Sequence, residues 1–290
     1  MVVQKNVCDS SNVNVINEMG KYKVLEHQKD LSVSSGNAVS EYFAAKMNIK
    51  KRQVLIELKD NGCVVQAGAM QWMSGDVSMG SGVKGVGNFI GKMVSAKVTG
   101  ESTVKPEYTG TGSVMLEPTY KYILLIDVSK WGSIVLDDGL FLACDNTLTQ
   151  KVVARNNVSS AVFGGEGLFN LSLSGDGILV CESNCPMEEL YEIELENDTL
   201  KIDGNMAIAW SGSLDFTVEK AGKSLIGSAV SGEGLVNVYR GTGKVLMAPT
   251  ARKSQSSPTD SDSDNAESKS KTQKAADAAE VISGVLDLFS

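Results

Sequence analysis

Three stretches of the chain resemble one another at a nearly constant spacing, and this self-similarity constrains the fold more than any single motif. The stretches are GESTVKPEYTGTGSVMLEPT (100–119), GGEGLFNLSLSGDGILVCES (164–183) and SGEGLVNVYRGTGKVLMAPT (231–250). Their second glycine pairs bring Gly112, Gly177 and Gly243 into register, 65 and 66 residues apart. Because a fixed period describes a whole architecture, we predict three internal repeats at 53–119, 120–183 and 184–250, which pack as one globular body over 1–250.

The local hydrophobic period predicts strands. Tyr191, Ile193 and Leu195 alternate with glutamates, and residues 169–174 alternate in the same way. Alternation with period two indicates a strand with one face on a core and the other in water. Short runs of this kind, bounded by Gly, Asn, Asp and Ser, are typical of an antiparallel sandwich or barrel. We therefore expect an all-β fold in which the Gly-Thr-Gly and Gly-Asp-Gly triplets form tight hairpin turns, because such turns need positive φ.

The glycines do not predict a nucleotide site. A dinucleotide fingerprint needs its glycines between a strand and a helix, whereas a strand pattern follows here. The best remaining candidate is GVKGVGNFIGKM, residues 82–93. In that stretch Met93 stands where a phosphate-binding loop needs Ser or Thr to reach magnesium.

Composition and charge exclude several partners. The net charge is −8, which disfavours nucleic acid because that binding depends on Lys and Arg neutralising phosphates. The first residues show no basic region followed by an apolar stretch, so no secretory signal is expected. No window offers ~20 uninterrupted apolar residues, so no membrane span is expected. The expected compartment is the cytoplasm.

The residue types that carry catalysis are scarce. The chain has one histidine, His27, and five cysteines, an odd number that predicts free thiols. Cys181 and Cys185 lack the second ligand pair that a structural zinc site needs. The acids Glu101 and Glu166 follow glycines at predicted turns, as does Glu233, where carboxylates accept local backbone hydrogen bonds. We therefore expect no enzyme activity, no catalytic residue, no cofactor and no metal ion.

Several linked segments together resemble a known family. They are KRQVLIELKDNGCVVQAGAMQWMSGDV, LDDGLFLACDNTL, GGEGLFNLSLSGDGILV, KIDGNMAIAWSGSLDF and SGEGLVNVYRGTGKVLMAP. They are similar to the altered inheritance of mitochondria protein 24 family, of the bacterial type, from about Tyr22 to Pro249. The resemblance implies tandem β-sandwich units of double-stranded β-helix type, like the tryptophan RNA-binding attenuation protein (TRAP). It also implies that chains associate, as trimers.

Two parts near the start of the chain do not follow the repeat pattern. Residues 1–52 form an N-terminal extension, in which 34–48 predict a short helix ahead of a basic stretch. The first repeat also carries extra residues around Val86, Phe89 and Ile90. These apolar side chains either pack in a longer loop on their own sandwich or contact another subunit or a partner protein, since exposed apolar loops mark binding surfaces.

The C-terminus predicts a tethered helix. Residues 251–274 are polar and low in large apolar side chains, so we expect a disordered linker. Residues 275–290 then become amphipathic on one helical stripe, formed by Val281, Ile282, Val285, Leu286 and Phe289. A short helix is marginal alone, so we expect it to dock, either on its own oligomer or on another protein.

The sequence therefore predicts a non-enzymatic, self-associating scaffold or adaptor. The alternative is a ring that binds a small ligand or RNA, by analogy with TRAP. TRAP binds RNA through basic residues, whereas this chain has no repeated basic position and carries acids at Glu101, Glu166 and Glu233.

Overall fold

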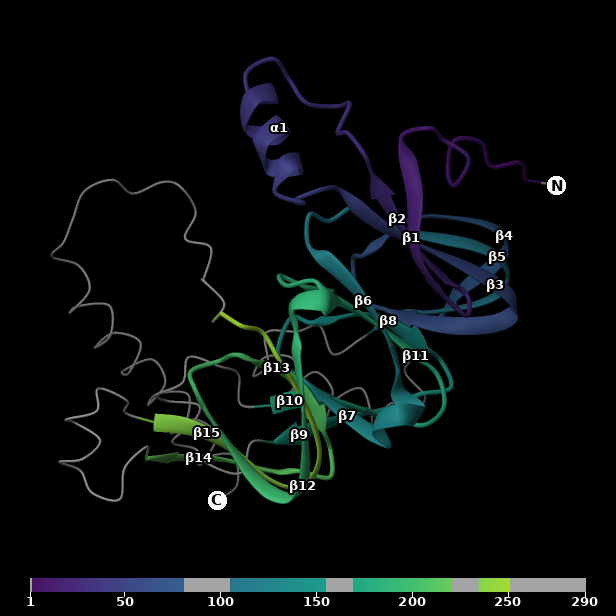
Figure 1. Ribbon diagram of the computed structural model, residues 1–290. Helices are drawn as coiled ribbons and strands as arrows, with labels where there is room; N and C mark the ends of the chain where they lie inside the picture. The colour runs from purple at the N-terminus through teal and green to yellow at the C-terminus, as the bar shows by residue number, and fades with distance from the viewer. Residues whose placement is uncertain (1, 81–104, 155–168, 221–234, 251–290) are drawn as a thin grey trace, which may run out of the picture.

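The computed structural model describes residues 2–80, 105–154, 169–220 and 235–250. Within these ranges the chain forms two curled β-sheets and one α-helix (Figure 1). The expectation of an all-β fold is confirmed. The finer assignment to TRAP-like units stays a prediction, and the predicted C-terminal helix lies outside the described residues.

The strands divide between an eight-stranded and a seven-stranded sheet. The eight-stranded sheet contains β1 (Val13–Met19), β2 (Tyr22–His27), β3 (Arg52–Val65), β4 (Met70–Gly80), β5 (Glu107–Leu116), β6 (Tyr122–Asp127), β8 (Phe141–Asp145) and β11 (Ile178–Ser183). The seven-stranded sheet contains β7 (Ser133–Leu136), β9 (Thr149–Ala154), β10 (Phe169–Ser174), β12 (Tyr191–Asp203), β13 (Ala207–Ser211), β14 (Asp215–Lys220) and β15 (Leu235–Met247). Two 3-10 turns, η1 (Val128–Trp131) and η2 (Met187–Glu189), and the helix α1 (Ala38–Lys46) complete the described elements.

One order of strand pairing occurs three times along the chain. In unit 1, which we define as β3 to β5, the last strand β5 pairs with both β3 and β4. In unit 2, β6 to β11, the strand β11 pairs with β6 and β8, and β10 pairs with β7 and β9. In unit 3, β12 to β15, the last strand β15 pairs with β12, β13 and β14. In every unit the last strand thus lies between the first and the middle strands.

The prediction that the glycine triplets turn hairpins is wrong for two of the three stretches. Gly112 lies inside β5 and Gly243 inside β15, and each strand is continuous; only residues 175–177 separate two strands. The corresponding Gly110, Gly175 and Gly241 have φ of +124°, +114° and +118°. A Cβ at Gly110 would lie 2.1 Å from the carbonyl oxygen of Asp76 on β4. Gly110 and Gly241 therefore give their long strands a positive-φ residue, and at Gly110 the missing side chain lets β5 lie close to β4.

The largest apolar cluster lies between the two sheets. Leu124 and Leu179 enter it from the eight-stranded sheet, and Leu136 and Leu246 from the seven-stranded sheet, all of them buried. Burying one leucine side chain stabilises a fold by roughly 1.5–3 kcal/mol. This cluster therefore holds the two sheets together through unit 2.

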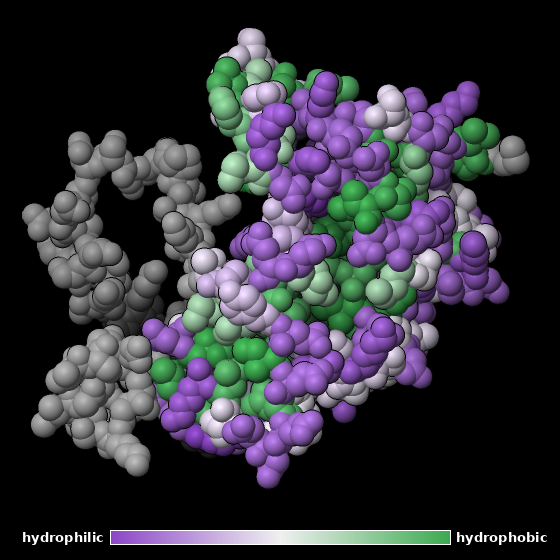
Figure 2. All heavy atoms as spheres, in the orientation of Figure 1, coloured by the Kyte–Doolittle hydropathy of each residue, from purple (hydrophilic) through white to green (hydrophobic). Residues whose placement is uncertain are grey.

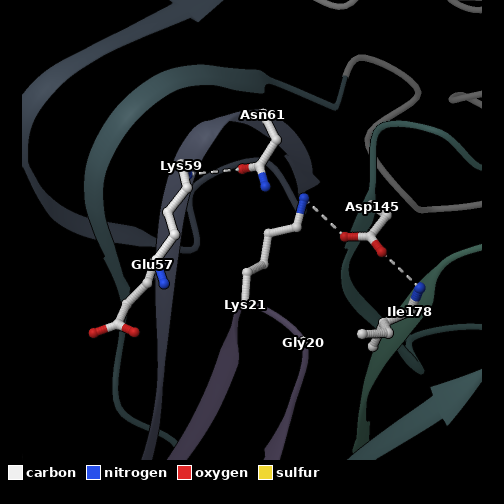
Figure 3. Close-up of a pocket in the computed structure, with 7 residues that line it drawn as sticks. All are labelled: Gly20, Lys21, Glu57, Lys59, Asn61, Asp145 and Ile178. Atoms are coloured by element: carbon white, nitrogen blue, oxygen red, sulfur yellow. Dashed lines mark hydrogen bonds and ion pairs between the residues drawn. The ribbon is translucent and has the colours of Figure 1, made fainter.

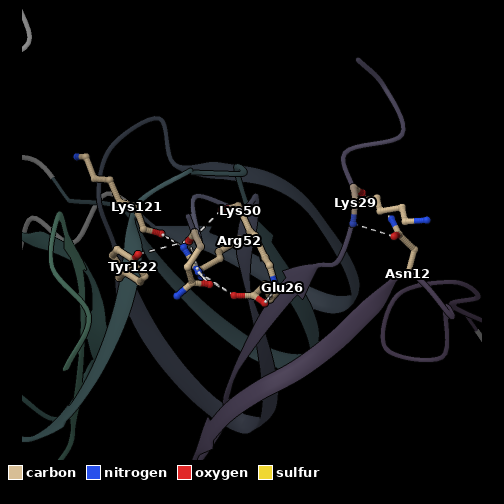
Figure 4. Close-up of polar contacts among 8 residues, drawn as sticks. Asn12, Glu26, Lys29, Lys50, Arg52, Lys121 and Tyr122 are labelled. Carbon is tan, nitrogen blue, oxygen red and sulfur yellow. Dashed lines mark hydrogen bonds and ion pairs between the residues drawn. The ribbon is translucent and has the colours of Figure 1, made fainter. Parts of the chain in front are cut away.

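A buried ion pair ties the N-terminal extension to unit 1 (Figure 4). The buried Arg52 donates from Nη2 to Oε2 of Glu26 at 2.8 Å, and Lys50 reaches the other oxygen at 2.8 Å. The guanidinium lies 4.3 Å from the ring centroid of Tyr122 and also donates to the carbonyl of Asn48 at 3.1 Å. We call these five residues the Arg52 cluster. It fixes both ends of the connection that carries α1, the helix expected at 34–48.

The Arg52 cluster predicts an acid-sensitive contribution to stability. Burial raises the pKa of Glu26, but hydrogen bonds from Lys50 and Arg52 outweigh burial and hold the pKa below its ordinary value of 4.5. A carboxyl whose pKa is lowered by folding stabilises the fold above its unfolded pKa, and this stabilisation disappears as the pH falls through the folded pKa. Glu26→Gln should lower the free energy of unfolding at pH 7 by about 3 kcal/mol, because Arg52 keeps a buried charge without its counterion.

Urea denaturation at pH 7 and at about pH 3 measures both effects. The difference between wild type and Glu26→Gln should shrink at the lower pH. Glu192→Gln removes one of the two carboxylate partners of the half-buried Lys244 and should cost less than about 1 kcal/mol. A constant difference at both pH values would contradict the assignment.

Candidate functional site

Consecutive units are joined by the same strand pairing at two places. At each place a strand from the beginning of one unit (β3 or β7) pairs, antiparallel, with a middle strand of the next unit (β8 or β13). We call this pairing a junction. The first junction joins β3 to β8 through the pairs Cys63–Asp145, Val64–Cys144 and Val65–Ala143. The second joins β7 to β13 through the pairs Ile134–Ser211, Val135–Trp210 and Leu136–Ala209.

The start of β4 occupies the same position in unit 1 as β8 does in unit 2 and β13 in unit 3, the strands that the following unit contributes to each junction. Met73, Cys144 and Trp210 each pair with the residue two positions after the aligned glycine, respectively Val114, Leu179 and Val245. A one-residue register shift precedes the pair in all three strands. Among the described residues, however, β4 pairs only with β5. Met73 is accordingly 43% exposed, whereas Cys144 is 0% and Trp210 4% exposed.

The end of β12 occupies the same position in unit 3 as the end of β3 does in unit 1 and β7 in unit 2, the strands that the preceding unit contributes to each junction. Leu200 pairs with Tyr239, four residues before Gly243, as Ile134 pairs with Leu173, four residues before Gly177. Lys201 therefore corresponds to Val135, the central residue of the second junction. In the described part of the chain β12 pairs only with β15, and Lys201 is exposed whereas Val135 is buried. Within the described ranges, the start of β4 and the end of β12 are therefore the two halves of a junction, each without its partner strand, and we call them open half-junctions.

The hydrogen bonds of the two junctions show which backbone groups point outward at the open edges. The N–H of Gln66 donates to the carbonyl of Leu142 at 2.7 Å, and Asp137 donates to Ile208 at 3.0 Å in the same way. Because bonding direction alternates along an antiparallel strand, every second residue from these positions faces the same side. The outward groups at the open edges therefore belong to Gln71, Met73 and Gly75 in β4 and to Thr199, Lys201 and Asp203 in β12.

The N-terminal segment covers a face of β4 rather than its edge. The amide of Gln4 donates to the hydroxyl of Ser74 at 3.0 Å, and Val7 packs with Trp72 in one apolar cluster. Ser74 and Trp72 flank Met73, so both side chains lie on the same face of β4 and neither contact involves the outward backbone groups of Met73. No described strand pairs with the other backbone edge of β4.

A polar hollow of about 280 Å³ lies beside the first junction (Figure 3). Asp145, the last residue of β8, accepts from the ammonium of Lys21 at 3.0 Å, from the hydroxyl of Tyr22 at 3.0 Å and from the N–H of Ile178 at 2.8 Å. Lys21 also donates to the carbonyl of Gly62 on β3 at 2.5 Å. The hollow therefore ties the β1–β2 hairpin to units 1 and 2.

The charged side chains around the hollow balance one another. Lys21 and Lys59 are balanced by Glu57 and Asp145. Burial, with the nearby Asp145 carboxylate, raises the pKa of the Tyr22 hydroxyl well above its ordinary value. Such a group stays protonated at neutral pH and donates a hydrogen bond to Asp145. We interpret the hollow as a structural polar contact.

Two buried thiols are also held in the protonated form. Burial raises the pKa of Cys63 to about 12 and that of Cys144 further. These thiols stay protonated at neutral pH, whereas nucleophiles and metal ligands are thiolates. His27 lies beside the amide of Gln53 at 3.0 Å. Among the described residues no group of three or more His, Cys, Asp or Glu side chains could hold a metal ion, and no helix is long and apolar enough to cross a membrane.

The site residues expected from the sequence fall outside the described residues. They are the loop residues Val86, Phe89 and Ile90 and the stripe residues Val281, Ile282, Val285, Leu286 and Phe289. The open edges were missed by sequence reasoning. The signal in the sequence is Trp72, where the two junctions have alanine, and Lys201, where they have valine.

Comparisons with known proteins each cover about two thirds of the chain or more. The sequence profile of the family described as mitochondrial biogenesis AIM24 matches residues 46–250. An uncharacterized protein of Streptococcus pyogenes serotype M6 is 32% identical over 201 residues, which is 66% of this chain and 79% of that protein. The X-ray crystal structure of a Streptococcus pyogenes protein is similar with a TM-score of 0.50 and 26% identity, over 70% of this chain and 89% of the other.

The polar hollow predicts a large effect of one carboxylate on stability. Asp145→Ala leaves the Lys21 ammonium, the Tyr22 hydroxyl and one backbone N–H without their acceptor, so the free energy of unfolding should fall by about 3 kcal/mol. Asp145→Asn keeps a hydrogen-bond acceptor and should cost less. Urea denaturation measures both variants, and a loss below about 1 kcal/mol for Asp145→Ala would contradict this account of the hollow.

Proposed function

Because the chain belongs to the family described as mitochondrial biogenesis AIM24, we propose that it is a non-enzymatic scaffold or adaptor whose copies join through their open strand edges. The pair of open half-junctions carries the proposal. The end of β12 in one copy pairs with the start of β4 in the next, in the register of the two junctions inside the chain. The proposed pairs are Leu200–Ser74, Lys201–Met73 and Ile202–Trp72.

The side chains at this contact suit an interface between chains. Trp72 stands where the first junction has Ala143 and the second has Ala209. Tryptophan and methionine are enriched in protein interfaces, and buried tryptophans carry much of the binding energy. Trp72 and Met73 are both partly or largely exposed in one copy, so both gain burial when the edge is covered. Backbone pairing supplies the remaining contacts, as in strand addition to an exposed sheet edge.

The contact is head-to-tail, which favours a closed ring. Such a contact uses two different surfaces, so assembly continues until a ring closes or a filament grows. An open filament leaves a bare strand edge at each end, and bare edges invite aggregation. We propose a closed homotrimer of TRAP-like units, the number of chains that the family resemblance implies.

The proposal gives the protein no catalytic role and no cofactor. It rests on the raised pKa values of the thiols, on the single histidine and on the charge-matched hollow. The net charge of −8 disfavours RNA as a partner. We place the protein in the cytoplasm, and we retain residues 275–290 as a tethered docking helix.

Proline at one position tests the proposed contact. Met73→Pro removes the outward N–H that the next copy accepts, yet proline is tolerated at an exposed strand edge because that N–H has no partner in its own sheet. The variant should sediment as a monomer where the wild type sediments as a trimer. Its melting temperature should fall only by the amount that assembly raises the melting temperature of the wild type.

Met79→Pro is the matched control. Met79 lies in the same strand, and its backbone N–H points to the same side as that of Met73. It lies beyond the residues that correspond to a junction. This variant should keep the trimer. A trimeric Met73→Pro, or a wild type that is monomeric at micromolar concentration, would contradict the proposed assembly.

A further inference from the structure

The helix α1 has an apolar face that no other described residue covers. Val39, Tyr42, Phe43 and Met47 follow one another at spacings of three, one and four residues, so their side chains share one side of the helix. Phe43 is 63% and Met47 74% exposed, and no side chain of α1 is buried. Figure 1 shows α1 standing away from both sheets, and Figure 2 shows apolar surface over it. We call these four residues the α1 face.

The helix is nevertheless held in a fixed place. Its C-terminal end leads into Asn48, whose carbonyl accepts from the buried Arg52 at 3.1 Å, and Ile49 donates back to the carbonyl of Ala44 at 3.0 Å. At the other end of the connection, Asp30 accepts from Lys51 at 3.0 Å. A helix that contributes nothing to the core is thus fixed on the body by polar contacts. Such an arrangement suits a docking surface better than a stabilising element.

We propose that the α1 face receives the chain's own C-terminal segment, residues 275–290. This inference rests on the proposed docking role of that segment and is independent of ring closure. The stripe of the segment, formed by Val281, Ile282, Val285, Leu286 and Phe289, has the width and period of the α1 face. Two short apolar stripes of this kind bury each other when the helices pack side by side.

The length of the tether permits the contact. Residues 251–274 span up to about 80 Å when extended. A compact body of 250 residues is about 45 Å across. The segment therefore reaches α1 from any point at which the tether leaves the surface.

The charges of the two partners are complementary. The connection 28–51 carries four lysines against Asp30 and Glu41, a net charge of +2. Residues 275–290 carry Asp277, Glu280 and Asp287 without Lys or Arg, a net charge of −3. Lys46 lies beside the α1 face, 5.3 Å from the ring centroid of Tyr42. It is placed to meet an acidic flank of the docked segment.

Photo-crosslinking in the full-length chain tests the proposal. A photoreactive benzoylphenylalanine at Phe43 should crosslink to residues 275–290, identified by mass spectrometry. Adding Ile282→Asp and Leu286→Asp places two charges on the stripe and should reduce the crosslink at least tenfold. Ser283→Asp with Ser290→Asp adds the same charge off the stripe and should leave the crosslink unchanged.

Limited proteolysis of the tail distinguishes this inference from the broader docking role. Phe43→Ser leaves the core intact, because α1 has no buried side chain, and should speed cleavage within 275–290 at least fivefold. The stripe variant should do the same, and neither should change the sedimenting mass. If the stripe variant speeds cleavage and Phe43→Ser does not, the segment docks elsewhere and this inference is wrong. If neither change has an effect, the docking role itself is wrong.

Discussion

Backbone hydrogen bonding at strand edges is the constraint on which the architecture depends. An unpaired N–H or C=O group costs free energy when it leaves water, so each strand needs a partner on any edge that packing covers. Two junctions meet this need inside the chain by joining each unit to the next. Within the described ranges, the first strand of the last unit and the middle strand of the first unit have no such partner. The proposed self-association would pair these two strands between copies.

Polar contacts fix the N-terminal extension to units 1 and 2. The Lys21–Asp145 ion pair ties the first hairpin to the first junction, and the Arg52 cluster ties the α1 connection to β2, β3 and β6. Each contact satisfies buried polar groups that would otherwise destabilise the fold. The extension therefore covers one edge of unit 1 through the β2–β3 pairing and, among the described residues, does not pair with the β4 edge. The proposed assembly surface is thus separate from the surface presented by α1.

The sequence predicts the features of this fold that are local. Alternation at Tyr191 to Leu195 predicts a strand, and β12 begins there; the helix expected at 34–48 contains α1. The glycine triplets misled because positive φ suits a hairpin turn and a bent strand equally, and only the partner strand distinguishes them. The polar hollow joins Tyr22 to a residue 123 positions away. Such contacts, and the open edges, depend on pairing between distant segments that one sequence does not display.

Complementation between two edge variants tests the central claim most directly. Met73→Pro blocks the β4 edge and leaves the β12 edge, whereas Lys201→Pro blocks the β12 edge and leaves the β4 edge. Each variant alone should sediment as a monomer. An equimolar mixture should form a heterodimer and stop there, because one β12 edge and one β4 edge are the only pair left. A mixture that stays monomeric, or variants that assemble alone, would contradict head-to-tail pairing through these edges.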